Sequence, residues 1–444
     1  MISCRAALWA CCVALVAAPS AVAGPPPGFE LRTIVTGLDA PTAMAYAADG
    51  RIFIAEKSGL VRVFDQGRLH TFVDLRDEVN QHSDRGLNNL VIDDRGRVFL
   101  FFTTELRPDD PDKGHPAGGT LIRIEAMRDD PNRADAKSRT TLISGFDSRG
   151  PWHSIGGLDF DPDGNLVVGF GDGSPYFPKE FSPAGFVVYA LTSPSGKILR
   201  IDPETGNGVP QNPLYVAARA DEIRSKIIAS GFRMPYRLTV DPADGAIYVG
   251  DVGTDQWEEI DVIAPASTGS ESVPNYGWPC YEGGGDGTPQ KRYIEEPYCV
   301  SRYYAAENAQ ELTTPPAYAY DAEGGAAVVL GPLGSSDGFP PQYDDRLFFA
   351  DFIRDRFWTY DDGGVSDFGE PGKWGGATDI ELTPGETLAY TALLTGQVNE
   401  IAYVGGEESG ASLRDLTVQW VGYAVGLIGV ITAFVIWRRS RVRS

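Results

Sequence analysis

His153, in the phrase RGPWHSIGGLDFDPDGNL, is the first residue of this chain whose type suits proton transfer. An imidazole takes up a proton near neutral pH, as a general base must. Gly156 and Gly157 follow it, and glycine allows another part of the backbone to approach closely. A loop histidine held by ordinary hydrogen bonds would have the same sequence, so both interpretations stay open. The other histidines lack the spacing of a metal site: His70, His82 and His115.

An acidic turn that contains glycine lies at residues 250–261, with the sequence GDVGTDQWEEID. Carboxylates and exposed carbonyls are the hard oxygen ligands that calcium takes, ~6 to 8 per ion. The turn lacks the spacing of an EF-hand loop, and a solvated acidic turn would have the same composition. A calcium site is therefore one of two interpretations of this segment.

Two arginines, Arg233 and Arg237, occur together in the phrase SGFRMPYRLTV. A guanidinium holds carboxylates or hydroxyl groups in a fixed plane, which suits the binding of an oxygen-rich ligand. The alternative is a surface ion pair with one of the many acidic residues of the chain. The sequence leaves both interpretations open for these two positions.

Short alternating strands must position these residues, because one pattern recurs six times along the chain. Each copy has an apolar stretch, a polar turn, a second apolar strand and a third strand. This is a hairpin plus one strand, and such a small sheet has to stack against the next copy. Six copies predict an all-β, six-bladed β-propeller over residues 24–404, closed by the strand at residues 30–35. The turns of the six copies fall at Asp49, Asp94, Asp163, Asp244, Asp344 and Pro384.

Both ends of the chain carry the patterns of an exported membrane protein. Residues 1–23 combine Arg5, an apolar run and an Ala-Val-Ala site, which predicts a cleaved signal peptide. Residues 405–415 read as a stalk, and the apolar residues 416–437 are long enough for one transmembrane helix. The arginine-rich tail at residues 438–444 predicts a cytoplasmic C-terminus. We therefore expect a membrane-anchored propeller in the periplasm or at the cell surface.

Cysteine usage and charge agree with export and narrow the choice of partners. Three of the five cysteines fall in the predicted signal peptide, which leaves Cys280 and Cys299. An isolated pair in an exported chain is most simply one disulfide bond. The formal net charge of −23 makes nucleic acid an unsuitable partner.

Five phrases of the chain resemble one family, the exported PQQ-dependent sugar dehydrogenases. This is the glucose/sorbosone and aldose sugar dehydrogenase family, which includes soluble quinoprotein glucose dehydrogenase. The similarity runs over most of residues 37–404. The phrases that carry it are DRGLNNLVID, WHSIGGLDFDPDGNL, SGKILRIDPETG, SGFRMPYRLTVDP and GDVGTDQWEEIDVI, the last with NYGWPCYEG.

The resemblance implies a quinoprotein oxidoreductase that oxidises the C1 hydroxyl of an aldose sugar. His153 would be the general base, Arg233 would contact the quinone and the sugar, and a quinone or a cytochrome would accept the electrons. The positions implied to bind PQQ are Asp84, His153, Arg233, Glu258, Arg354 and Arg356. The residues implied to hold Ca²⁺ are Gly253, Thr254, Glu259 and Tyr276.

The chain also departs from the pattern of that family. Met234 stands where an asparagine is usual, and residues 374–379 bring no cation to the sixth blade. These departures favour the alternative of a non-enzymatic propeller ectodomain that binds a carbohydrate or a protein partner. A third class, hydrolysis of a lactone or phosphodiester, would place calcium in the central channel instead.

Overall fold

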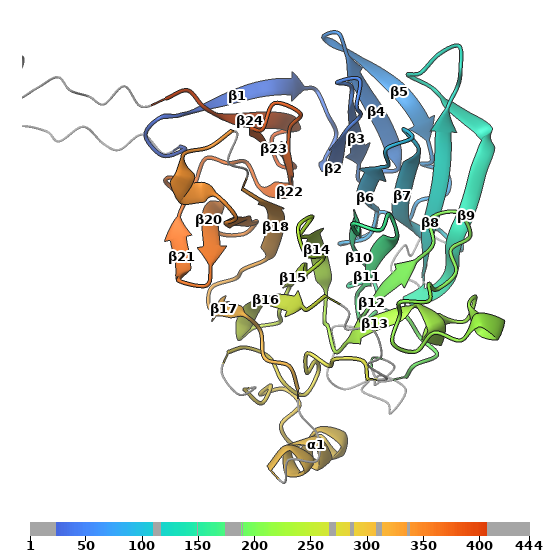
Figure 1. Ribbon diagram of the computed structural model, residues 1–444, viewed down its shortest axis with the longest axis vertical. Coiled ribbons are helices and arrows are strands. Elements are labelled where there is room, and N and C mark those ends of the chain that lie inside the picture. Colours follow the sequence, from blue (N-terminus) through green and yellow to red (C-terminus); the bar gives the residue numbers. More distant parts are fainter. Residues whose placement is uncertain are drawn as a thin grey trace, which may run out of the picture.

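The computed structural model describes residues 24–109, 117–148, 150–173, 188, 190–265, 272–284, 288–307, 313–334 and 338–405. In this part of the chain the strands form six four-stranded sheets, each with antiparallel neighbours (Figure 1). The innermost strands of successive sheets contact one another around a central axis. The predicted all-β, six-bladed β-propeller is therefore confirmed.

Each of the first three blades uses four consecutive strands. Blade 1 contains β2 (Pro41–Tyr46), β3 (Ile52–Glu56), β4 (Leu60–Asp65) and β5 (Arg68–Asp74). Blade 2 contains β6 (Leu87–Ile92), β7 (Val98–Thr104), β8 (Ala117–Ala126) and β9 (Ala134–Ser148). Blade 3 contains β10 (Ile155–Phe160), β11 (Leu166–Phe170), β12 (Lys197–Ile201) and β13 (Ile227–Ser230).

The next blades carry the largest insertion and the closure of the ring. Blade 4 contains β14 (Pro235–Val240), β15 (Ile247–Asp251), β16 (Trp257–Ile263) and β17 (Tyr318–Asp321). Between β16 and β17 lies the helix α1 (Pro297–Glu307). Blade 5 contains β18 (Val328–Leu333), β19 (Leu347–Asp351), β20 (Arg356–Asp361) and β21 (Gly364–Asp367). Blade 6 contains β22 (Ala377–Leu382), β23 (Leu388–Ala392), β24 (Gln397–Tyr403) and β1 (Phe29–Thr36).

The ring closes because the N-terminal strand completes the last blade. β1 pairs with β24 from Phe29 opposite Tyr403 to Thr36 opposite Gln397. This pairing covers the outer edge of β24, which would otherwise be open to pairing with another chain. The predicted closing strand at residues 30–35 is confirmed.

Apolar side chains and glycines hold neighbouring blades together. Between blades 2 and 3, the ring of Phe170 packs 5.1 Å from both Phe101 and Phe146, measured between centroids. Between blades 3 and 4 the backbones approach so closely that a Cβ on Gly156 would lie 2.2 Å from the carbonyl oxygen of Pro235. A larger residue would push these inner strands apart, which explains the glycines after His153.

The terminal predictions fall outside the described residues. These are the signal peptide at 1–23, most of the stalk at 405–415, the transmembrane helix at 416–437 and the tail at 438–444. Within the described ranges, no helix combines the length and the apolar character needed to cross a bilayer.

Candidate active site

His153 lies in the loop that leads into β10, the innermost strand of blade 3. Its backbone has a φ of 54°, and its N–H donates to Oδ2 of Asp84 over 2.7 Å. Its side chain is 13% exposed, and Nδ1 lies 2.9 Å from Oδ1 of Asp172. Because the Asp172 carboxylate accepts, Nδ1 carries the proton and Nε2 keeps its lone pair. The geometry thus prepares Nε2 to act as a base.

Asp172 is held between the histidine and an indole. It follows β11, is 2% exposed, and its Oδ2 accepts a hydrogen bond of 2.8 Å from Nε1 of Trp278. Its backbone N–H donates to the carbonyl of Arg233 over 2.8 Å. A carboxylate fixed at both oxygens cannot rotate, so it holds the imidazole in one orientation.

Arg233 lies in the equivalent loop of blade 4, just before β14. Its guanidinium carbon is 5.5 Å from the ring centroid of Trp278, a cation–π contact. Nη1 donates to the carbonyls of Val252, over 2.7 Å, and of Gly253. Nε and Nη2 donate to no residue among those that the structure describes. These two nitrogens are therefore donors that a ligand can engage.

The carboxylate of Asp251 fixes the loop that carries Arg233. Asp251 ends β15, and its two oxygens accept the backbone N–H groups of Arg233 over 2.8 Å and of Met234 over 2.5 Å. Burial raises the pKa of Asp251 to about 7, although these two donors oppose the rise. Met234 itself is 5% exposed. Its backbone is held by Asp251 while its side chain offers no hydrogen bond to the site.

Asp84 adds a second carboxylate beside His153. Burial raises the pKa of Asp84, and the neighbouring charges of His153, Arg85 and Arg233 lower it. Its Oδ1 is buried and has no hydrogen-bond partner in the described structure. The structure therefore brings three of the predicted residues together, namely Asp84, His153 and Arg233.

The other predicted cofactor residues are committed to different contacts. Oε2 of Glu258 accepts the N–H of Val328 over 2.9 Å, and burial raises the pKa of Glu258 to about 8. Arg354 donates to the carbonyl of Asp321, and its guanidinium stacks on Tyr320 at 5.3 Å. Arg356 forms an ion pair of 2.8 Å with Asp367 on the outermost strand of blade 5. No described contact joins either arginine to His153 or Arg233.

The predicted calcium residues surround the same turn of blade 4. The Gly253 carbonyl accepts from the Arg233 guanidinium, and the N–H of Thr254 donates to the carboxylate of Glu282. Glu259 accepts the N–H of Gly283. The hydroxyl of Tyr276 donates to the carbonyl of Val262 over 2.7 Å. Each of the four residues therefore contacts blade 4 or its insertion, and their role as calcium ligands stays a prediction.

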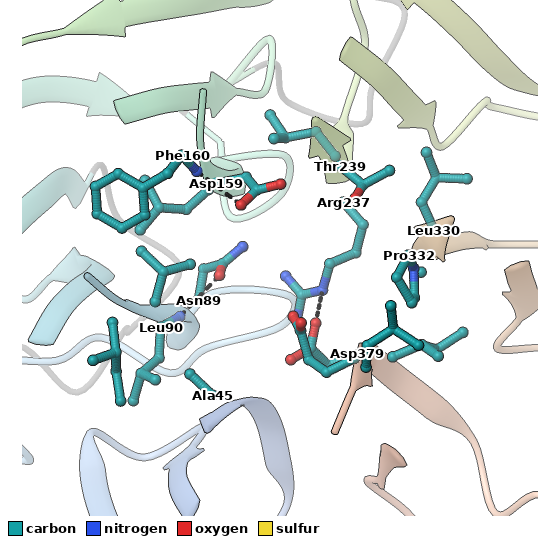
Figure 2. A pocket seen from close by; sticks show the side chains of 18 of the residues that line it. Ala45, Asn89, Leu90, Asp159, Phe160, Arg237, Thr239, Leu330, Pro332 and Asp379 are labelled. Carbon is teal, nitrogen blue, oxygen red and sulfur yellow. Dashed lines mark hydrogen bonds and ion pairs between the residues drawn. The ribbon is translucent and has the colours of Figure 1, made fainter. Parts of the chain in front are cut away.

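Arg237 lines a cavity between the inner strands and points toward Asp379 (Figure 2). Arg237 is 3% exposed and forms an ion pair of 3.0 Å with Asp379 of blade 6. It also donates to the carbonyls of Thr378, over 2.9 Å, and of Thr42, over 2.6 Å. The interpretation of Arg237 as a surface ion pair is wrong, because the pair is buried and links blades 1, 4 and 6. Inner strands line a cavity of about 210 Å³ around it.

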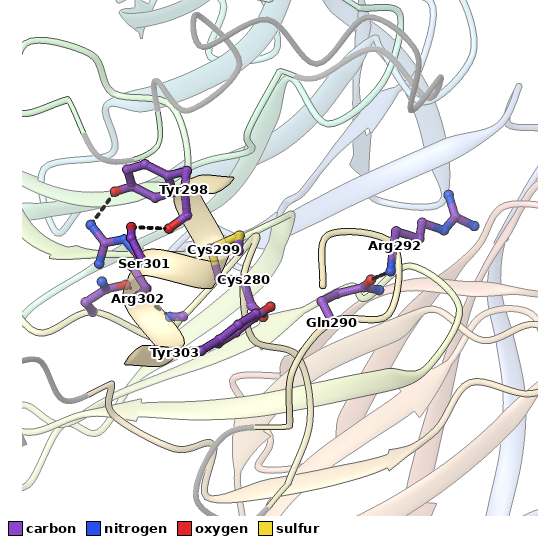
Figure 3. The surroundings of a disulfide bond; sticks show 10 residues. Cys280, Gln290, Arg292, Tyr298, Cys299, Ser301, Arg302 and Tyr303 are labelled. Atoms are coloured by element: carbon purple, nitrogen blue, oxygen red, sulfur yellow. Dashed lines mark hydrogen bonds between the residues drawn. A yellow bond between two sulfur atoms is a disulfide. The ribbon is translucent and has the colours of Figure 1, made fainter. Parts of the chain in front are cut away.

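The insertion of blade 4 forms a cap over the turn, and a disulfide bond fastens it (Figure 3). Cys280 and Cys299 are bonded, which confirms the predicted pair. The hydroxyl of Tyr303 on α1 donates to the carbonyl of Cys280 over 2.6 Å. Trp278 belongs to the same apolar cluster as the disulfide. The cap therefore delivers the indole that binds Asp172.

Comparison with known families decides the relationship of this chain. The sequence profile of the family described as Glucose / Sorbosone dehydrogenase matches residues 38–306. This chain belongs to that family. The match spans the loops that carry Asp84, His153 and Arg233, so the resemblance seen in the sequence phrases is confirmed.

Solved structures share the propeller of this glucose/sorbosone dehydrogenase family member at low sequence identity. A putative oxidoreductase (glucose dehydrogenase) from Thermus thermophilus is 22% identical, with a TM-score of 0.61, covering 84% of this chain and 99% of that one. The PQQ-bound aldose sugar dehydrogenase of Streptomyces coelicolor is 18% identical, with a TM-score of 0.60 and coverages of 85% and 99%. The apo-form soluble aldose sugar dehydrogenase of Escherichia coli is 19% identical, with a TM-score of 0.63 and coverages of 84% and 99%.

Sequence reasoning missed two residues of this glucose/sorbosone dehydrogenase site, Asp172 and Trp278. Asp172 lies in the phrase GFGDG, two residues after the end of β11, whereas Asp251 is the last residue of β15 in the next copy of the repeat. An acid close to the end of the second strand in both copies is a signal that could have identified it. Trp278 lies 106 residues further along the chain, inside a non-repeating insertion, and no periodicity points to it.

Proposed function

We propose that this member of the glucose/sorbosone dehydrogenase family oxidises the C1 hydroxyl of an aldose sugar with PQQ as the cofactor. The observation that carries the proposal is the contact between Nδ1 of His153 and Asp172, which leaves Nε2 to act as the base. The family supports a sugar substrate. Two structural neighbours are named as PQQ-bound or holo forms, from Streptomyces coelicolor and Coprinopsis cinerea, and they support this cofactor.

The residues present fit an oxygen-rich quinone. Arg233 is fixed by Val252, Gly253 and the Trp278 ring, yet keeps Nε and Nη2 free of described acceptors. When bound, PQQ would supply an electrophilic carbonyl that accepts a hydride. Arg233 would hold an oxygen of the quinone, and a guanidinium there stabilises negative charge that develops during the reaction. Asp84 accepts the backbone N–H of His153 with Oδ2, and its Oδ1 has no partner among the described residues.

Side chains of the protein carry out the proton transfer and stabilise the charge that it produces. Nε2 of His153 removes the proton of the C1 hydroxyl while the hydrogen on C1 leaves as a hydride with its electron pair. The sugar C1 thereby becomes a carbonyl carbon. Asp172 stabilises the imidazolium that forms, because its carboxylate already accepts from Nδ1. Trp278 keeps Asp172 in place throughout.

The location of the protein is a further part of this proposal. The predicted signal peptide at 1–23 and the predicted helix at 416–437 support an exported, membrane-anchored enzyme with its propeller outside the cytoplasm. Such a location suits electron transfer to a quinone or a cytochrome. Membrane fractionation, followed by protease treatment of intact cells, tests it. The proposal would be contradicted if the propeller resisted the protease to the same extent as a cytoplasmic control protein.

The competing function is a non-enzymatic ectodomain that binds a carbohydrate or protein partner. Its support is that Arg354 and Arg356 are occupied elsewhere and that Met234 offers no hydrogen bond. A trianionic cofactor needs positive charge, since burying an unpaired anion costs several kcal/mol. Whether the protein binds PQQ therefore distinguishes the sugar dehydrogenase from the non-enzymatic ectodomain.

The deciding experiment titrates the purified protein with PQQ in the presence of calcium and then screens a panel of aldoses by dye-linked oxidation. We expect saturable binding that raises the melting temperature, because the ligand binds only the folded chain. His153→Gln should abolish turnover with binding retained, whereas Arg233→Met should weaken binding. His70→Gln, on the outermost strand of blade 1, is the matched control. A folded protein that neither binds PQQ nor oxidises any aldose would refute the enzyme and favour the ectodomain.

A further inference from the structure

Arg85 is a fully buried arginine next to the active site, and the proposed reaction gives it no role. It follows Asp84 in the loop before β6 and is 0% exposed. A guanidinium keeps its positive charge in proteins, and burying a charge is unfavourable unless its donors are hydrogen-bonded. The hydrogen-bond partners of Arg85 therefore indicate what this buried charge contributes.

The guanidinium of Arg85 holds the segment that leads from the end of β9 to His153. Its Nη2 donates to the carbonyl of Ser148, over 3.3 Å, and to the carbonyl of Gly150. Ser148 is itself buried, and its hydroxyl donates to the same Gly150 carbonyl over 2.9 Å. The carbonyl of Gly150 therefore accepts two hydrogen bonds, one from Arg85 and one from its own segment.

Backbone hydrogen bonds connect Gly150 to His153. The N–H of Gly150 donates to the carbonyl of Gly173 over 3.1 Å, and the N–H of Gly173 donates to the carbonyl of His153 over 3.0 Å. In addition, Asp84 accepts the N–H of His153 over 2.7 Å. Two adjacent residues of one loop, Asp84 and Arg85, therefore hold both ends of the segment from Gly150 to His153.

His153 needs this support because its backbone is in an unfavourable conformation. Its φ of 54° lies in the left-handed region, where a Cβ crowds the backbone. A residue other than glycine keeps such a conformation only where the surrounding structure enforces it. The direction of the imidazole depends on this backbone conformation, so the hydrogen bonds at Gly150 and at the N–H of His153 also determine where Nε2 lies.

The loop that contains Asp84 and Arg85 is itself fixed to its surroundings. Nδ2 of Asn88 donates to the carbonyl of Asp84 over 2.8 Å. A Cβ on Gly86 would lie 2.6 Å from the carbonyl oxygen of Lys57 in blade 1, so this loop packs closely against the neighbouring blade. A loop that is held in this way can impose a fixed position on the segment that it contacts.

We infer that Arg85 is a positioning residue, which keeps His153 in the orientation in which Nε2 can act as a base. It acts through the carbonyls of Ser148 and Gly150. Burial raises the pKa of Asp84, and the charge of Arg85 is one of those that oppose the rise. The inference rests on the proposed oxidation only for its kinetic test, because the orientation of His153 can also be observed without PQQ or sugar.

The test compares Arg85→Met with Arg97→Met in the full-length protein. Arg97 is the matched control, because it is also buried in blade 2, at 8% exposed, but forms ion pairs with Asp93 and Glu204. The first measurement is the NMR signal of the proton on Nδ1 of His153, recorded without PQQ and assigned by its loss in His153→Gln. We expect Arg85→Met to shift or broaden this signal and Arg97→Met to leave it unchanged.

The second measurement is steady-state kinetics with PQQ and an aldose. A displaced base weakens an interaction made in the transition state, so Arg85→Met should lower kcat about 10- to 100-fold with the KM for the aldose little changed. Arg85→Lys keeps a positive donor without the planar fork, and it should recover part of the loss. If Arg85→Met fails to fold, Ser148→Ala removes the hydroxyl that donates to Gly150 and should also shift the His153 signal.

The inference is overturned if Arg85→Met, or Ser148→Ala in its place, leaves the His153 signal as in the wild type. It is equally overturned if Arg97→Met alters the signal as much, or if an active enzyme keeps its kcat in Arg85→Met. A wild-type protein without turnover would refute the proposed oxidation, and the NMR comparison would still decide the role of Arg85.

Discussion

Asp172 determines what His153 can do, because it fixes which imidazole nitrogen is protonated. Its Oδ1 lies 2.9 Å from Nδ1. Asp172→Asn would let an amide N–H face Nδ1 and place the proton on Nε2, where it blocks base catalysis. We expect kcat/KM for the aldose to fall about 10²- to 10⁴-fold, with PQQ affinity little changed.

A pH–rate profile and a PQQ titration separate this positioning role from a structural one. Asp163→Asn, in the exposed turn between β10 and β11, is the control and should behave as wild type. If Asp172→Asn kept full turnover with an unshifted profile, the assignment of Asp172 would be wrong.

The indole of Trp278 has two separable roles, one through its N–H and one through its ring. Trp278→Phe keeps an aromatic face for Arg233 but removes the hydrogen bond of 2.8 Å to Asp172. We expect kcat to fall about tenfold, corresponding to about 1.4 kcal/mol for one lost hydrogen bond to a charged group, while PQQ binding persists. Steady-state kinetics beside a binding titration check this. If Trp278→Phe lost affinity for PQQ but kept a normal kcat, this assignment of the two roles would be wrong.

Residue type alone identified His153 and Arg233, but it could not supply their partners. Asp172 and Trp278 meet because the cap folds back over blade 3, and such a contact between distant segments leaves no periodic signal. Conversely, Arg354 and Arg356 were expected at the cofactor from their blade alone. Their local acceptors, Asp321 and Asp367, hold them elsewhere.

At the level of elements, an acid at the end of the second strand, or two residues after it in blade 3, recurs in four blades and usually holds the backbone. Glu56 accepts the N–H of Asp39, Asp251 accepts two N–H groups, and Asp351 accepts those of Ile353 and Arg354. Asp172 differs because each of its two oxygens contacts a side chain, His153 or Trp278, whereas Asp351 accepts one side-chain hydrogen bond, from Tyr320, beside its two backbone ones. In most of these blades the acid therefore fixes the backbone of a loop. In blade 3 the corresponding acid, Asp172, orients the imidazole of His153 instead.

The cap depends on covalent closure because it has little regular structure. The bond between Cys280 and Cys299 closes a loop with a sequence separation of 19. Replacing both by alanine should lower stability by about 3 kcal/mol in the chain-entropy estimate, with the loss concentrated in the cap. Hydrogen exchange should show faster exchange at residues 276–303 than in blades 1 and 2.

Function should also respond, because Trp278 lies only two residues before Cys280. We expect the alanine pair to weaken PQQ binding and to lower kcat modestly. Reduction of the wild-type protein under mild conditions should produce the same effects. Uniform protection across cap and blades, with unchanged kinetics, would show that packing alone holds the cap.

At the scale of the whole molecule, the propeller was predictable because its signal is repeated. Six copies of the hairpin pattern fix the blade number, and the leftover strand at 30–35 has one place to pair. The insertion between β16 and β17 repeats nothing, so its helix and its contact with Asp172 could not be derived. The residues that line the space inside the ring also depend on which side chains of the inner strands face the axis.

The cavity around Arg237 is lined by more acidic than basic side chains, which predicts a pH-dependent weakness of the fold. Glu381 lines the cavity with Asp159, Arg237 and Asp379, and no described residue forms a hydrogen bond with it. Burial, and then the charges of Asp379 and Asp159, hold the pKa of Glu381 well above its ordinary value. Between the ordinary pKa of a glutamate in the unfolded chain and the raised pKa of Glu381 in the folded chain, the folded state binds more protons than the unfolded state. Stability therefore falls as pH rises through that window.

Glu381→Gln removes this titration and keeps the shape of the side chain. The variant should match wild type near pH 4, where both side chains are neutral, and exceed it by about 1 kcal/mol at pH 8. Urea denaturation at several pH values measures the difference, with Glu323→Gln at an exposed turn as the control. If the variant were instead less stable at pH 8, the ionised Glu381 would have to be stabilising the ring, through Arg237 or a bound cation in the channel.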